Sequence, residues 1–213
     1  MATIPLKPQY GPTLGTLLAP RWHAAPRAVR GLVRAACAGI VVLAVAVALT
    51  LWPATYSHGG AAPFHFSYRG LYRTVPEPGQ YVRIDRRAAG RLEDSFAVSP
   101  LRLPPYSGGL SGELPVYASG YIRGLSRKFS GFTLRGEGKT RVNTVPAYNI
   151  FYTATVEGRE MYGRDVLLLP EGQGVRDGVA LEMLTLPSAA VTSPLEVATG
   201  GVLERPVETF TIS

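Results

Sequence analysis

The sequence predicts an α+β fold, in which an antiparallel β-sheet packs against one main helix and a short C-terminal helix, after a single N-terminal transmembrane helix. Three observations predict it. A long apolar segment lies near the N-terminus, and residues 114–129 repeat apolar side chains at helical spacing. Several later segments alternate apolar and polar residues as strands do. The apolar share of 46% is enough for a core, so a folded domain is expected.

Residues 35–52 are the predicted transmembrane helix, because they are uncharged and mostly apolar. At a rise of about 1.5 Å per residue they nearly cross a hydrocarbon core of roughly 30 Å. Arg27, Arg30 and Arg34 precede the segment, and the first carboxylate of the chain is Glu77. The positive-inside rule makes these arginines the topology determinants, with the N-terminus cytoplasmic and the C-terminal domain outside the cell membrane.

Four regions follow from this assignment. Residues 1–34 are a cytoplasmic tail that contains proline and arginine, and residues 53–63 are a short linker. Residues 64–213 are the extracytoplasmic α+β domain. Trp52 and Tyr56 follow the apolar segment and are expected at the membrane interface, where amphipathic rings are favoured.

Processing of the N-terminal segment is left open by the sequence. Cleavage after Ala48 fits the small-residue rule for signal peptides, but the apolar run continues beyond that residue and favours an uncleaved signal-anchor. Cys37, the only cysteine, lies inside the predicted span. The outer domain is therefore expected to have no disulfide and to depend on its core for stability.

The first part of the outer domain reads as strands followed by a helix. Residues 64–69 alternate aromatic and polar side chains, a second short strand is expected over 81–85, and a third extended segment over 96–103. Residues 114–129 form the main helix, with one buried face and basic side chains near its C-terminal end, where they favour the helix dipole.

The second part of the domain is mostly strand. Residues 148–156 and 160–169 form a hairpin around an Glu-Gly-Arg turn, and 179–186 form the next strand. A capping box with proline at the first helical position predicts a short helix from residue 193 to about residue 200. Residues 207–212 are expected to close the sheet as a last strand.

This order of elements resembles the PsbP-like α/β/α sandwich family, the fold of the photosystem oxygen-evolving subunit and of several bacterial envelope proteins. The resemblance covers about residues 64–212 and is carried by LPVYASGYIRGLSRKF, by AYNIFYTATVEGREMYGRDVLLLP and by GVALEMLTL. It implies a membrane-anchored bacterial envelope protein. The chain departs from the photosynthetic members in its N-terminal anchor and in lacking recognisable metal ligands.

Residues 136–140, GEGKT, look like the end of a nucleotide-binding phosphate loop. That loop needs glycine where Thr133 stands and a helix directly after the lysine, whereas Pro146 follows shortly here. We therefore expect no nucleotide, and interpret the segment as a strand–turn–strand passage. Nucleic acid is not expected either, because the basic excess lies in the N-terminal region and charge is nearly balanced from residue 58 onward.

Residues suited to catalysis are sparse. His65, oriented by Asp85 or Asp94, is the candidate for a nucleophilic triad, although its alternation with Phe64 and Phe66 favours the solvent face of a strand. Only two histidines, His58 and His65, are expected outside the membrane, and without cysteine or a local acidic cluster they do not specify a metal site. The sequence therefore predicts no catalytic residue, no metal and no cofactor.

Carboxylate pairs are the other catalytic candidates. Glu93 and Asp94 are neighbours, but adjacent residues of a strand point to opposite faces. Glu157 and Glu160 flank the hairpin turn, where charges are usually solvated.

Arg164 and Asp165 lie in the middle of a strand. We expect a structural ion pair with a neighbouring strand there, and a binding site is the alternative.

The densest group of basic residues in the outer domain lies on the main helix and just after it. If these side chains share one face, they form a surface for an anionic partner; otherwise they belong to a solvated face. The group consists of Arg123, Arg127, Lys128, Arg135, Lys139 and Arg141.

The sequence thus predicts a single-pass, membrane-anchored extracytoplasmic domain that binds or scaffolds an envelope or membrane-protein partner without catalysis. Residues 35–52 would contact membrane lipid. One alternative is a small envelope hydrolase that uses His65 or paired carboxylates. Another is a carrier of a small molecule or lipid, with a pocket between the sheet and residues 114–129.

Overall fold

The computed structural model describes residues 26–60, 62–104, 110–169 and 176–212. The chain divides into two compact units, Met1–Leu49 and Thr50–Ser213. Most of the predicted cytoplasmic tail lies outside the described residues.

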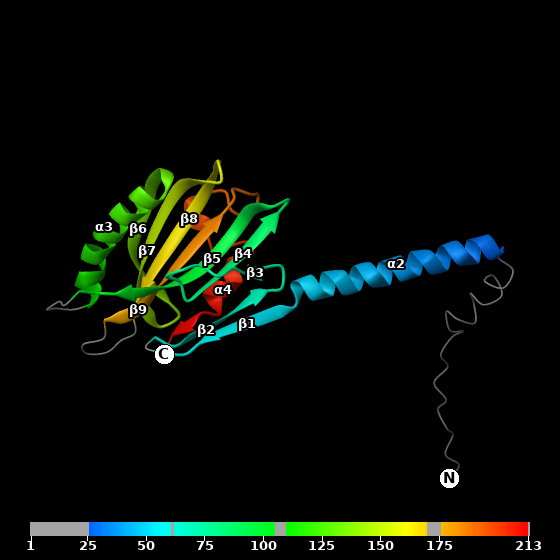
Figure 1. Cartoon of the computed structure of the whole chain (residues 1–213), viewed down its shortest axis with the longest axis horizontal. Coiled ribbons are helices and arrows are strands. Elements are labelled where there is room, and N and C mark those ends of the chain that lie inside the picture. Colours follow the sequence, from blue (N-terminus) through cyan, green and yellow to red (C-terminus); the bar gives the residue numbers. More distant parts are fainter. Residues whose placement is uncertain (1–25, 61, 105–109, 170–175, 213) are drawn as a thin grey trace, which may run out of the picture. The chain divides into compact units, whose positions relative to one another are not determined.

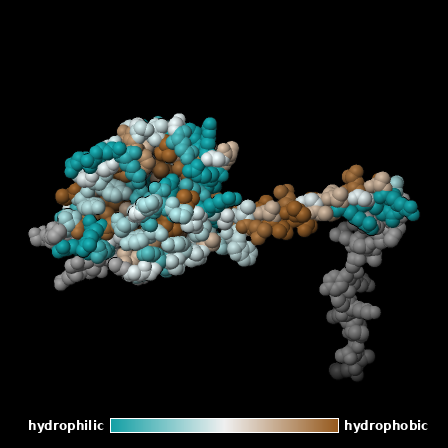
Figure 2. Space-filling view, viewed as in Figure 1, coloured by the Kyte–Doolittle hydropathy of each residue, from teal (hydrophilic) through white to brown (hydrophobic). Residues whose placement is uncertain are grey.

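Helix α2 (Arg27–Leu51) has no buried residue, and its apolar side chains are exposed along its length (Figure 2). Among the described residues, it is the one helix long and apolar enough to cross a membrane. The helix begins earlier than the predicted span of 35–52 and includes all three arginines. Arginine, alanine and leucine favour helix, and no proline interrupts the chain between Pro26 and Pro53.

A seven-stranded antiparallel sheet forms the centre of the second unit, in the order β3-β4-β5-β9-β8-β7-β6 (Figure 1). Its strands are β3 (Arg73–Thr74), β4 (Val82–Ala88), β5 (Arg91–Arg102), β6 (Ser130–Val142), β7 (Val145–Val156), β8 (Arg159–Leu168) and β9 (Asp177–Thr185).

A smaller sheet has the order β1-β2-β10. It consists of β1 (Pro53–His58), β2 (Phe64–Arg69) and β10 (Thr211–Ile212). Two expectations differ from this arrangement. The region predicted as a linker begins with β1, because Tyr56 packs against the aromatic rings of β2. The last strand pairs with β2 and not with the central sheet.

The two faces of the central sheet are covered by different layers. On one face, alternate residues such as Ile84, Phe96 and Leu181 pack with Phe66 of the small sheet and with Phe210. On the other face, residues such as Ile150, Leu167 and Ala180 form a second core cluster with the side chains of a helix. The predicted α+β fold with an antiparallel sheet is confirmed, and the helix and the small sheet lie on opposite sides of it (Figure 1).

That helix is α3 (Leu110–Lys128), and it confirms the predicted main helix. It packs over β6 and β7, at one edge of the sheet. The capping box forms as expected, with the Ser193 hydroxyl accepting from the Leu195 N–H, but it begins only a single 3₁₀ turn, Pro194–Glu196. The prediction of a helix to about residue 200 is therefore wrong beyond this turn, and the short C-terminal helix is α4 (Glu204–Glu208), which takes the place of the first residues of the predicted strand 207–212.

The predicted hairpin of β7 and β8 is present, and its turn has positive φ at Glu157 and Gly158. Positive φ at both central residues is the geometry that fits the twist of a two-residue hairpin. GEGKT lies inside β6 and not at a bend. The turn comes later, at Asn143, and Gly136 instead adjoins a register shift of the β6–β7 pairing.

Gly163 of β8 tests the packing of the α3 side of the sheet. A Cβ at this position would overlap the ring of Tyr152, whereas a Cβ at Gly138 of edge strand β6 would meet no neighbour within 4 Å. We expect Gly163→Ala to lower the free energy of unfolding by about 1–3 kcal/mol, as overpacking does. Gly138→Ala is the matched control and should change it by less than about 0.5 kcal/mol. Equal effects in urea titrations would contradict this packing.

Candidate functional site: a charged belt beside helix α3

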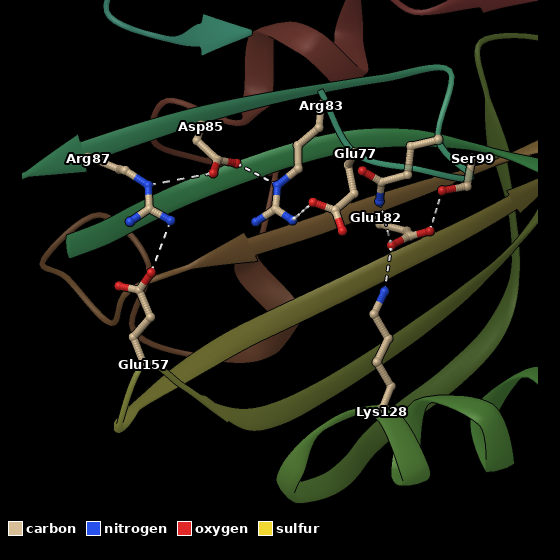
Figure 3. A network of polar contacts seen from close by, with 9 residues as sticks. Glu77, Arg83, Asp85, Arg87, Ser99, Lys128, Glu157 and Glu182 are labelled. Atoms are coloured by element: carbon tan, nitrogen blue, oxygen red, sulfur yellow. Dashed lines mark hydrogen bonds and ion pairs between the residues drawn. The ribbon is translucent and has the colours of Figure 1, made fainter. Parts of the chain in front are cut away.

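Helix α3 covers only part of its face of the sheet. On β4, β5 and β9 the same face carries polar side chains, which we call the charged belt. Because the row Arg83–Ala97–Glu182–Asp165 runs across β4, β5, β9 and β8 in register, the belt continues directly into the α3 core. The belt consists of Arg83, Asp85, Arg87, Ser99 and Glu182 of these strands, together with the residues that bond to them from neighbouring segments, which are Glu77, Gln80, Lys128 and Glu157. Figure 3 labels all of them except Gln80.

Asp85 organises one half of the belt. Its carboxylate is 3% exposed and lies between two arginines, 2.8 Å from Arg83 Nε and 3.8 Å from Arg87 Nε. Arg87 extends the chain of ion pairs to Glu157 of the hairpin turn, at 3.0 Å. Arg83 also lies 3.6 Å from Glu77. Long charged side chains therefore shield this half of the sheet.

Glu182 organises the other half. Lys128, at the end of α3, donates from Nζ to Glu182 at 3.1 Å. Gln80 Nε2 and Ser99 Oγ donate to the same carboxylate at 3.3 and 2.5 Å. Glu182 thus joins α3, β5 and the loop before β4, as Figure 3 shows.

Asp165 lies opposite Glu182 on β8 and is fully buried. Tyr121 of α3 and Tyr152 of β7 place their hydroxyls 2.9 and 3.1 Å from its two carboxyl oxygens. Burial, followed by repulsion from Glu182, raises the pKa of Asp165 from 3.8 to about 8. The neutral acid is therefore favoured at neutral pH. In that form it donates one hydrogen bond and accepts the other.

A cavity of about 160 Å³ opens between the end of α3 and the belt. Its polar lining comes from Gln80, Arg83, Ser95, Lys128 and Glu182, and its apolar lining from Ala97, Phe129, Tyr152, Val156 and Leu184. The Oε1 atom of Gln80 is buried and has no hydrogen-bond donor among the described residues. The cavity therefore has room for one side chain.

His65 is exposed on β2, and its ring faces the Thr211 hydroxyl at 2.8 Å. It is thus placed on the open face of the small sheet, as its alternation predicted. Asp85 lies in the belt on the far side of the central sheet, so it cannot orient His65.

Glu93 and Asp94 were expected to point to opposite faces of a strand, but both carboxylates pair with the same arginine. The β4–β5 register pairs Arg86 with Asp94 and Arg87 with Leu92, so Glu93 is an extra, bulged residue. The bulge cancels the alternation, and both carboxylates form ion pairs with Arg86. Asp94 also accepts from Thr185 Oγ1 at 2.5 Å. These groups border a cavity of about 270 Å³ next to residues 186–203.

Glu157 and Glu160, the other two candidate carboxylates, lie apart from each other. Glu157 accepts from the Leu92 N–H, which lowers its pKa, and it also pairs with Arg87. Glu160 lies with Arg135 and Tyr162 at the opposite face of the sheet.

The expected ion pair of Arg164 or Asp165 with a neighbouring strand is wrong. Their side chains point to opposite faces, and neither meets an opposite charge in the described structure. Arg164 donates to the Asn149 amide oxygen and to the Val197 carbonyl, and it lies over the Phe151 ring. The buried guanidinium group of Arg164 is thus satisfied by neutral acceptors. Its hydrogen bond to Val197 holds the segment after the 3₁₀ turn against the sheet.

The predicted basic surface is divided by the fold. Arg123 and Arg127 lie on the exposed side of α3. Lys128 turns to Glu182 in the belt. The register shift in β6 sends Arg135 to the face opposite α3, into a cavity with Thr153. The remaining two, Lys139 and Arg141, stay exposed on β6.

The structure also places the two residues predicted for the membrane interface and the residues that could ligate a metal. Trp52 is 70% exposed and remains suited to an interface. Tyr56 is instead held by the domain, since its hydroxyl donates to the Tyr81 carbonyl at 3.2 Å. Among the described residues, no three histidine, cysteine or acidic side chains lie close enough together to hold a metal ion.

Sequence reasoning missed the belt, because its members come from five separate segments. Glu182 sits alone in an apolar strand, GVALEMLTL, and this isolation was an available signal. A charged residue in such a strand must meet a partner or water.

Comparisons with solved structures support the fold. The chain is similar to LpqN, described as involved in cell envelope biogenesis of Mycobacterium tuberculosis, with a TM-score of 0.52, 12% identity, and coverage of 76% of this chain and 91% of that one. It is also similar to the cyanobacterial PsbP protein CyanoP from Synechocystis, with a TM-score of 0.50, 12% identity, and coverage of 76% and 94%. The predicted PsbP-like fold is confirmed.

No family model matches the sequence, and no curated protein matches it. At 12% identity the structural likeness defines the fold class alone.

Asp165 gives the domain a testable pH dependence. Its folded pKa lies above its ordinary value of 3.8, so the native state binds more protons than the unfolded state between about pH 4 and pH 8. Stability should therefore fall as pH rises through this window, by at most about 1.4 kcal/mol per pH unit. Asp165→Asn keeps one donor and one acceptor for the two tyrosines and should remove this slope. Parallel losses in both proteins, measured by urea unfolding, would contradict the assignment.

Proposed function

We propose that the protein is a single-pass, membrane-anchored domain of the cell envelope that binds a protein partner through the charged belt and has no catalytic role. The anchor is α2, with Arg27, Arg30 and Arg34 on the cytoplasmic side and the C-terminal unit outside. Support comes from the apolar, unburied helix and from the likeness to an envelope-biogenesis protein.

The observation that carries the proposal is the cavity at the end of the belt. Its volume of about 160 Å³ suits one inserted side chain, which would meet the polar side chains of its lining, such as Ser95 and Lys128. Anchoring side chains in small, desolvated pockets dominate many protein interfaces. The surrounding ion pairs would form the polar rim, which favours specificity over affinity.

The alternatives receive less support. A hydrolase would need a free acid and a base in one cleft, but His65 is exposed on the small sheet, and Glu93 and Asp94 both engage Arg86. A lipid carrier would need an apolar cavity beneath α3. The α3 side chains Leu114, Ala118 and Leu125 instead pack into the sheet as part of its core.

Filling the cavity tests the proposal. Ala97 is 2% exposed and lines the cavity, so Ala97→Leu should occupy it. Crosslinking of the tagged full-length protein in its native membranes, followed by purification, should recover a specific partner. We expect Ala97→Leu to reduce that recovery about tenfold, which corresponds to about 1.4 kcal/mol.

The matched control is Ser126→Leu, which adds the same side chain on the exposed side of α3 and should leave recovery unchanged. Thermal unfolding of both variants checks that the fold survives. Undiminished recovery with a filled cavity, or recovery no greater than that of the tag alone, would reject the proposal.

A further inference from the structure

The turn between β2 and β3 is tied to the residue that follows the membrane helix. The Gly70 N–H donates to the Trp52 carbonyl at 3.0 Å, and Pro53 pairs with Arg69 in the β1–β2 register. Trp52 alone separates the end of α2 at Leu51 from the start of β1. Covalent connection and pairing therefore keep this turn near the end of the apolar segment, whatever the orientation of the domain.

Within β1, β2, β3 and the turn between β2 and β3, the charged side chains are all arginines. Arg69 and Arg73 flank it, and neither forms an ion pair within the described part of the chain. No aspartate or glutamate precedes Glu77 in the sequence, so β1, β2 and β3 contain no carboxylate. Asp85, which is paired in register with Arg73, is already engaged by the arginines of the belt.

Trp52 adds an amphipathic ring to this pair of cations. It is 70% exposed, so the domain does not use it as core. An exposed tryptophan next to unpaired arginines, directly after an apolar helix, has the composition of a membrane interface: the ring suits the headgroup level and the guanidinium groups suit phosphate.

We propose that Trp52, Arg69 and Arg73 form a surface that binds the anionic phospholipid headgroups of the membrane that α2 spans. This inference rests on the proposed membrane anchoring. Attraction between arginines and an anionic lipid surface acts over a Debye length of about 8 Å at physiological salt, and the short connection keeps the turn in a position to use it. The surface would fix which side of the domain faces the lipid.

A fluorescent label at Thr74, which is exposed in β3, reports the distance from the turn to the headgroups. The full-length protein carries Cys37→Ala and Thr74→Cys, so that the label has a single attachment site. It is placed in nanodiscs of phosphatidylcholine, with or without phosphatidylglycerol, that contain a trace lipid with a nitroxide on its headgroup. We expect quenching to rise about twofold when phosphatidylglycerol is present, and to return towards the phosphatidylcholine level in high salt.

Arg69→Gln combined with Arg73→Gln should abolish the increase due to phosphatidylglycerol. The matched control, Arg123→Gln with Arg127→Gln, removes the same charge from the exposed side of α3 and should retain it. Quenching that does not respond to phosphatidylglycerol, or an equal loss in both double variants, would overturn the proposal.

A second readout separates this proposal from the anchoring itself. The chain has two tryptophans, so Trp22→Phe leaves Trp52 as the only indole. Lipids brominated on their acyl chains should quench Trp52 if α2 is inserted. Quenching of Trp52 without a lipid-dependent change at Thr74 would reject the headgroup surface alone. Absence of Trp52 quenching would reject the anchor and the headgroup surface together.

Discussion

The attachment of α3 to the sheet is the constraint on which the rest of the outer domain depends. A single amphipathic helix covers only β6 and β7, and its polar anchors reach further, to Asp165 on β8 and Glu182 on β9. A buried carboxyl group is tolerated there because it is held neutral and satisfied by two tyrosine hydroxyls. The remaining strands on this face must be shielded by their own long side chains.

The charged belt is needed because α3 covers only part of its face of the central sheet. On the other face, the small sheet and Phe210 bury the apolar side chains of the central strands, so that face is a conventional core. On the α3 face, the belt ion pairs lie partly exposed, and such pairs contribute little to stability. The proposed recognition would give these pairs a further role, because charged pairs around a small cavity would fix the register of a partner.

Much of the fold was predictable because strand and helix periodicity are local. Residues 114–129 and the hairpin around Glu157 and Gly158 were placed correctly, since burial of one face imposes the pattern on the sequence itself. The strand at Pro53–His58 was missed because small residues and histidine obscure its alternation. Its pairing with β2 depends on aromatic rings that come later in the chain.

The candidate site was much less predictable, for two physical reasons. A β-bulge at Glu93 reverses the side to which neighbouring residues point, and register alone reveals it. The belt also joins residues as distant as Gln80 and Glu182, whose contact depends on strand order. Asp165 was singled out from the sequence, but its partners are tyrosines of α3 and β7 and not an opposite charge.

Site-specific photo-crosslinking is the most direct test of the central claim that the charged belt is a binding surface. A photoreactive amino acid at the exposed belt position Arg87 or Glu77 should, in native membranes, join the protein to one discrete partner. The same amino acid at Arg127 or Lys139, both exposed away from the belt, should not. Crosslinks of equal yield at all four positions, or from the control positions alone, would contradict the account.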